Sequence, residues 1–180
     1  MQFKLTKKEK SWILYDVGNS AFVLMVSTIL PVYFNYLAQN AGVSDVDYLA
    51  YWGYAASIST LIVAVLGPVM GTLADTRGFK KSLFLSCILV GCAGCLLMGL
   101  TTWWISFLVI FIIAKVGFHS SLVFYDSMLS DVTTPERMDR VSSSGYAWGY
   151  AGSCIPFVVS LVFVLGYQKM GLSFETGMMI

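Results

Sequence analysis

Five long apolar stretches divide this sequence, and each is long enough to cross a lipid bilayer as a helix. A bilayer core about 30 Å thick requires about 20 apolar residues in helical form. The five stretches cover residues 12–37, 48–73, 82–100, 103–129 and 141–167. We therefore expect an all-α membrane protein, a polytopic helical bundle of five spans. The short tail that ends in Met178, Met179 and Ile180 is expected to begin a sixth helix.

The composition supports a membrane protein and argues against several other classes. With 57% apolar and 12% charged residues, the chain has too little polar material to cover a soluble domain of 180 residues. Nucleophile–base arrangements, phosphate-binding loops and basic nucleic-acid-binding faces are not visible in the sequence. We expect no enzyme activity, no cofactor, no metal and no nucleic-acid partner. The cysteines all lie in apolar stretches and are expected to be small, buried packing residues: Cys87, Cys92, Cys95 and Cys154.

Positive charges are distributed unevenly among the connections between the stretches. Nine of the eleven Lys and Arg residues lie before the first stretch, after the second or before the fifth. They are Lys4, Lys7, Lys8, Lys10, Arg77, Lys80, Lys81, Arg137 and Arg140. Since positive residues stay preferentially on the cytoplasmic side, the N-terminus is expected in the cytoplasm.

The connection after the second stretch contains more than topology requires. Its glycines and charged residues are Gly71, Asp75, Arg77, Gly78, Lys80 and Lys81. Basic residues fix the orientation of the neighbouring helices, and Gly78 suits a turn. Gly71 and the carboxylate of Asp75 four residues later have no role in that explanation.

This connection resembles the loop motif of the major facilitator superfamily, which lies between the second and third spans on the cytoplasmic side. The matching residues are Gly71, Asp75, Gly78 and Lys80. Thr76 and Phe79 stand where basic residues are usual, and Arg77 follows one place later than the pattern. The resemblance implies a major-facilitator-like bundle. It also implies that Asp75 caps a neighbouring helix and pairs with Arg or Lys, in a latch that holds the outward-facing state.

Two further regions resemble the Atg22-like, or UMF1, branch of that superfamily. They cover residues 12–22 with 31–34, and residues 124–129 with 135–136 and 141–152. Since the superfamily has about twelve spans in two halves, the resemblance implies that residues 1–180 form a partial N-terminal transmembrane bundle. The C-terminal half of the same protein would then be its partner in the lipid bilayer. The implied function is secondary active transport of a small solute by alternating access, with amino acids or similar metabolites favoured and protons as a candidate coupling ion. The resemblance also implies the plasma (inner) membrane in a bacterium and the vacuolar membrane in a eukaryote.

Polar residues inside the apolar stretches are candidates for a substrate or proton pathway, because such residues are costly in a membrane. Asp16 and Asn19 are three residues apart, near the cytoplasmic end of the first stretch. They either line the central cavity or its inner gate, or Asp16 is solvated or paired with a loop arginine. In the fourth stretch, Lys115, His119 and Asp126 are separated by four and seven residues and share one helix face.

Lys115 is the most costly of these residues to place inside a membrane. Counted from Trp103, it lies roughly 18 Å into the membrane, where a lone ammonium costs about 2.5–3.5 kcal/mol. It needs either a carboxylate on a helix beyond this chain or an anionic group of the substrate. His119, one turn further on, is either a proton relay or a packed polar residue.

Small residues and a charged connection complete the candidate features. Gly67 and Gly71 in the second stretch, and Gly145, Gly149 and Gly152 in the fifth, are expected to line helix-packing faces, either static or rocking during transport. Residues 130–140 mix acidic and basic residues, and form either a solvated turn or a gate closed by ion pairs with Asp75 and Lys80. The charged residues of that segment are Asp131, Glu136, Arg137, Asp139 and Arg140.

Two other hypotheses remain open from the sequence. The chain would also fit a complete small membrane protein, a channel subunit or scaffold that oligomerises through its glycine faces. An intramembrane enzyme that uses His119 and Asp126 is the third possibility.

Overall fold

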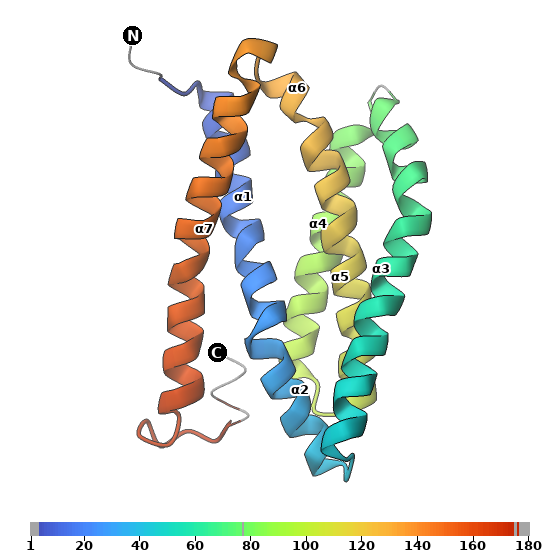
Figure 1. The fold of residues 1–180 in the computed structure, drawn as a ribbon, viewed down its shortest axis with the longest axis vertical. Helices are drawn as coiled ribbons and strands as arrows, with labels where there is room; N and C mark the ends of the chain where they lie inside the picture. Colours follow the sequence, from blue (N-terminus) through green and yellow to red (C-terminus); the bar gives the residue numbers. More distant parts are fainter. Residues whose placement is uncertain (1–3, 77, 175, 177–180) are drawn as a thin grey trace. The chain divides into compact units, whose positions relative to one another are not determined.

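Every regular element in the described part of the chain is a helix (Figure 1). The computed structural model describes residues 4–76, 78–174 and 176. Its helices are α1 (Lys7–Ser27), α2 (Ile29–Asn40), α3 (Asp45–Asp75), α4 (Lys80–Leu100), α5 (Trp104–Ser127), α6 (Leu129–Val132) and α7 (Pro135–Gly166). Five helical segments in the described residues are long and apolar enough to cross a membrane, with α1 and α2 together forming the first. The expected all-α polytopic architecture is therefore confirmed. Met178, Met179 and Ile180, the expected start of a sixth helix, lie outside the described residues.

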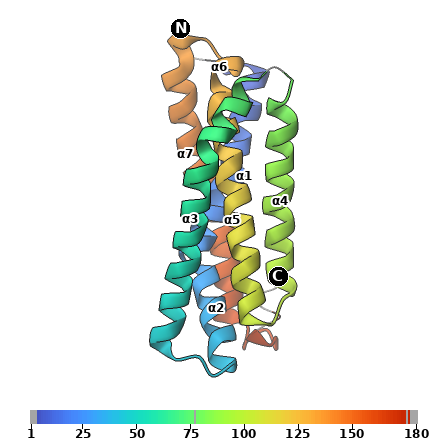
Figure 2. The same ribbon diagram turned by 90° about the vertical axis from the view of Figure 1, so that its right-hand side faces the viewer.

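The helices form two compact units. One unit contains α1, α6 and α7, and the other contains α3, α4, most of α2 and nearly all of α5. Figure 2 shows α3, α4 and α5 of the second unit running alongside one another.

In the first unit, the glycines of α7 face α1. A Cβ atom at Gly149 would lie 2.7 Å from Ser20 Oγ, and one at Gly145 would lie 2.9 Å from the Trp12 ring. At Gly152, a Cβ atom would collide with Val17. Because these positions have no side chain, the backbones of the two helices approach closely.

In the second unit, α4 and α5 also meet through small residues. A Cβ atom at Gly94 would lie 2.6 Å from Ala114 Cβ, and one at Gly117 would lie 3.0 Å from the Cys87 carbonyl oxygen. By contrast, a Cβ atom at Gly67 or Gly71 of α3 would meet nothing within 4 Å in the described chain. Within the described residues of the second unit, these two positions therefore have no close packing partner.

The first apolar stretch is interrupted at Thr28, between α1 and α2. The cause is local, because Pro31 has no N–H group to donate to the carbonyl of Ser27, four residues earlier. Just before the interruption, the hydroxyls of Ser27 and Thr28 donate to the carbonyls of Val23 and Leu24. By contrast, α3 and α7 continue through Pro68 and Pro156.

Favourable residues stand at the starts of two long helices. Ser44 caps α3 and accepts a hydrogen bond from the Asp47 amide at 3.2 Å, while Thr134 and Pro135 start α7. Between α3 and α4, Gly78 has a φ of +91°, a conformation that favours glycine.

The cysteines differ from expectation. Cys92, Cys95 and Cys154 are exposed on helix surfaces and Cys87 is half-buried, and none of the four is in a disulfide. A thiol is apolar enough for the outer surface of a membrane helix, so burial in the bundle is not required.

Candidate functional site

Lys115 lies in α5, eleven residues after the helix begins, and is half-buried. Its Nζ donates to the Ala56 carbonyl oxygen of α3 at 3.4 Å and lies 5.8 Å from the centre of the Phe111 ring. Within the described residues, it forms no ion pair. The charge is therefore compensated only by one long hydrogen bond and one aromatic face.

An aromatic cluster of the second unit reaches this lysine through Phe111. Trp52 of α3 stacks on Phe111 of α5 with ring centres 4.3 Å apart. Phe34 stacks on Trp52 at 5.7 Å and on Phe107 at 6.0 Å. The result is a continuous aromatic cluster that spans α2, α3 and α5 and has Lys115 at one end.

The other two candidates on α5 have fewer contacts. The helix is continuous from Trp104 to Ser127, so Lys115, His119 and Asp126 lie on one element. His119 is half-buried and its ring meets Phe118 edge-on, with ring centres 5.1 Å apart. Asp126 is exposed.

The candidates on α1 lie in the first unit. Asp16 points toward the glycine face of α7, since its Oδ2 would lie 3.3 Å from a Cβ atom at Gly145 and 3.2 Å from one at Gly149. No hydrogen bond joins the Asp16 carboxylate to a described residue, and the alternative in which Asp16 pairs with a loop arginine is not seen among those residues. Asn19 is half-buried on the same helix.

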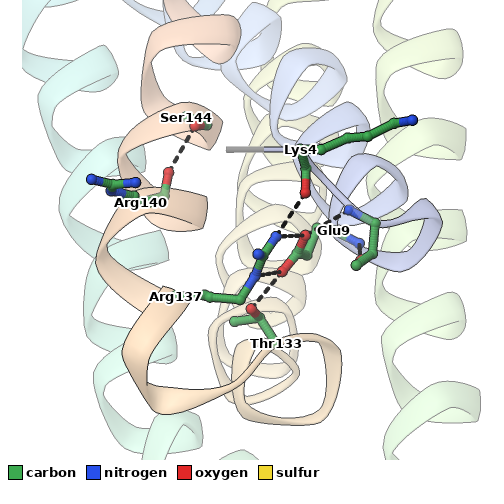
Figure 3. Close-up of polar contacts among 7 residues, drawn as sticks. Lys4, Glu9, Thr133, Arg137, Arg140 and Ser144 are labelled. Carbon is green, nitrogen blue, oxygen red and sulfur yellow. Dashed lines mark hydrogen bonds and ion pairs between the residues drawn. The ribbon is translucent and has the colours of Figure 1, made fainter. Parts of the chain in front are cut away.

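A polar cluster that the sequence did not predict joins the start of α1 to the start of α7 (Figure 3). The Glu9 carboxylate is only 1% exposed and forms an ion pair with Arg137 at 2.8 Å. Arg137 donates from Nε to one Glu9 oxygen and from Nη2 to the other, both at 2.8 Å. Thr133 Oγ1 and the Thr6 amide add two further donors, each at 2.7 Å. All four acceptor positions of the carboxylate are thus filled.

The same cluster extends to the chain before α1. Arg137 Nη2 also donates to the Lys4 carbonyl oxygen at 3.0 Å. The Thr6 hydroxyl accepts from the Glu9 amide at 3.3 Å, which completes a capping box with Glu9. One carboxylate therefore caps α1 and fastens it to α7.

Residues 130–140 are mostly helical, in α6 and the first turns of α7. Arg137, one of the possible partners for Asp75 in the sequence analysis, forms an ion pair with Glu9. A capping-box pattern, Thr6 followed three residues later by Glu9, was present in the sequence and would have revealed the start of α1.

The loop motif occupies the junction of α3 and α4. Asp75 is the exposed last residue of α3, while Lys80 and Lys81 are the first two residues of α4. Gly78 makes the turn, and Arg77 lies outside the described residues.

Other sites are poorly supported in the described residues. They contain no group of three His, Cys, Asp or Glu side chains that could hold a metal ion. A cavity of about 460 Å³ lies among α3, α4 and α5, but its lining is almost wholly apolar, including Leu66, Met70 and Val116. It offers nothing that would orient a polar solute.

Five long apolar helical segments with a lysine inside one of them are typical of a multi-pass membrane transporter. Comparison with known proteins identifies the family to which the chain belongs. The sequence matches the family described as "Vacuole effluxer Atg22 like" over residues 5–179. It is also 40% identical over 168 residues to the "Uncharacterized MFS-type transporter YxiO" of Bacillus subtilis (strain 168). The chain belongs to the Atg22-like family of MFS-type transporters, not to a family of enzymes.

The chain corresponds to only part of its relative. The alignment covers 92% of this chain and 39% of the Bacillus protein. No solved structure matches the chain.

Proposed function

We propose that the full-length protein is a secondary active transporter that moves a small solute across the membrane by alternating access between two helical bundles. An amino acid or a similar metabolite is the favoured solute. The observation that carries this proposal is the family match over residues 5–179, together with the MFS-type relative of which this chain spans 39%. The part of the Bacillus protein that this chain does not cover would correspond to the second bundle.

Within this half, polar side chains of α1 and α5 are the proposed pathway. Lys115 and His119 lie within α5, and Asp126 lies near its end. Asp16 and Asn19 lie on α1. Carboxyl and imidazole groups in a span are the groups that relay protons in many transporters, so protons are the proposed coupling ion.

The loop between α3 and α4 is the proposed latch of the transport cycle. Exposure leaves Asp75 available to a partner in the other bundle, and Lys80 and Lys81 place positive charge at the same end of the helices. The positive residues around it favour a cytoplasmic position for this loop and for the N-terminus, in the plasma membrane of a bacterium.

Uptake into proteoliposomes tests the coupling part of the proposal. The full-length protein would be reconstituted and labelled amino acids supplied with and without an imposed pH gradient. We expect uptake of at least one amino acid to increase with the gradient and to fall when a protonophore collapses it. Uptake that is independent of the gradient for every transported solute would contradict proton coupling.

A further inference from the structure

The hydrogen bond that holds Lys115 is a weak anchor for a charged group. Ala56, whose carbonyl oxygen accepts from Lys115 Nζ at 3.4 Å, also accepts from Ser59 Oγ at 2.8 Å and Thr60 Oγ1 at 2.9 Å. A carbonyl oxygen has two lone pairs, so three side-chain donors exceed its capacity. The lysine has the longest of the three contacts, and is the donor most easily withdrawn.

No carboxylate compensates the ammonium in the described part of the chain. A charged side chain in a span almost always faces a partner or a water-filled cavity. Within the described residues, Lys115 therefore has spare hydrogen-bonding capacity and no ionic partner. Both favour an anionic ligand, because charge-assisted hydrogen bonds to a carboxylate are stronger than a bond to a neutral carbonyl.

The surroundings of the lysine indicate what else the ligand carries. Phe111 lies beside the ammonium, and Trp52 stacks on Phe111 at 4.3 Å. Trp52 is half-buried, whereas Phe111 is fully buried. A cation next to a partly accessible aromatic surface suits a solute with a carboxylate at one end and an apolar body at the other.

We propose that Lys115 binds the carboxylate of the transported solute, with Trp52 against its apolar body. This inference rests on the proposed transport function, and names the residue that holds the carboxylate of the solute. It contrasts with a structural role in which Lys115 pairs with a carboxylate elsewhere in the full-length protein.

The first test needs no solute. The melting temperature of the purified full-length protein would be compared for Lys115→Gln, Lys115→Arg and Lys169→Gln, the last removing a charge from an exposed position outside the helices. We expect Lys115→Gln to melt at or above the wild-type temperature, because no ionic partner is lost. A much lower melting temperature for Lys115→Gln than for Lys115→Arg would overturn the proposal, since removing one member of a buried pair leaves the other charge unpaired.

The second test compares leucine and phenylalanine with leucinamide and phenylalaninamide, which lack the negative charge. Bound ligand raises the melting temperature, so we expect the acids to stabilise the wild type and Lys169→Gln more than the amides do. In Lys115→Gln, we expect the affinity for the acids to fall by about tenfold or more. An unchanged preference for the acids in Lys115→Gln would overturn the proposal.

The two tests separate this inference from the proposed function. If no amino acid binds or is transported by the wild type, the proposed solute class fails. The solute-free comparison still decides whether Lys115 has a carboxylate partner within the protein. Such a partner would overturn the proposal that Lys115 binds the carboxylate of the solute.

Discussion

Glu9 lies in a lysine-rich segment but is buried, with the donors of Arg137, Thr133 and Thr6 around its carboxylate. A buried carboxylate is stable only when its hydrogen-bonding capacity is met, and the bidentate Arg137 contact also fixes geometry. This residue therefore links the chain before the first span to the start of α7. Its role is the assembly of this part of the bundle.

Replacement of Glu9 tests that role. We expect Glu9→Gln to lower the free energy of unfolding by about 1–3 kcal/mol, since an amide cannot accept from all four donors and leaves Arg137 without its ionic partner. Denaturant titration of the full-length protein in detergent would measure the change. The control is Asp139→Asn, which changes an exposed acid on α7. Equal stability of the two variants would contradict the assigned role.

The sequence predicted some of these residues and not others for a physical reason. Lys115 was recognisable because a charge inside an apolar stretch is exceptional. Glu9 was not, because an acid among lysines resembles solvated surface. The capping-box spacing of Thr6 and Glu9 is a local signal, but Arg137 lies 128 residues away from Glu9 and no sequence pattern joins them.

At the scale of elements, the glycines on one face of α7 allow α1 to pack closely against that helix. Gly149 and Gly152 lie against Ser20 and Val17, and a Cβ atom at either glycine would collide with those side chains. The close approach adds van der Waals contact, which drives helix association in a membrane.

A large side chain at this face should separate the helices. We expect Gly152→Leu to destabilise the protein by about 1–3 kcal/mol through overpacking against Val17, measured by the same titration. Gly99→Leu is the control, because a Cβ atom at Gly99 meets nothing within 4 Å in the described chain. If both leucine variants are equally stable, α1 and α7 do not depend on this close contact.

The number of spans could be predicted from the sequence because bilayer thickness fixes helix length. The interruption at Thr28 was missed, since residues 12–37 are apolar enough on average to be taken as one span, and hydropathy does not register a lost backbone hydrogen bond. Pro31 was the available signal, because its missing N–H affects the carbonyl of Ser27 four residues earlier.

At the scale of the whole molecule, transport needs a second bundle, and the Bacillus relative is long enough to contain one. The junction of α3 and α4 presents the exposed Asp75 beside Lys80 and Lys81. A latch between bundles would form and break in each cycle, so its loss should alter the rate of transport more than the assembly of the protein.

Substitution of Asp75 distinguishes a latch from a turn residue. We expect Asp75→Asn to slow transport by the full-length protein severalfold, because the amide loses the charge that pairs with basic partners. Membrane insertion and thermal stability should stay close to wild type, since Asp75 is exposed. Initial transport rates at equal protein content would measure the effect. An unchanged rate would show that Asp75 only ends α3.

Solute counterflow tests the central claim, that this chain is part of a transporter, most directly. Proteoliposomes with the full-length protein would be loaded with an unlabelled amino acid and diluted into a trace of the labelled one. Alternating access predicts transient accumulation of label above equilibrium, for at least one amino acid and without any ion gradient. No accumulation for any of the amino acids, with correctly folded protein in the membrane, would contradict the account.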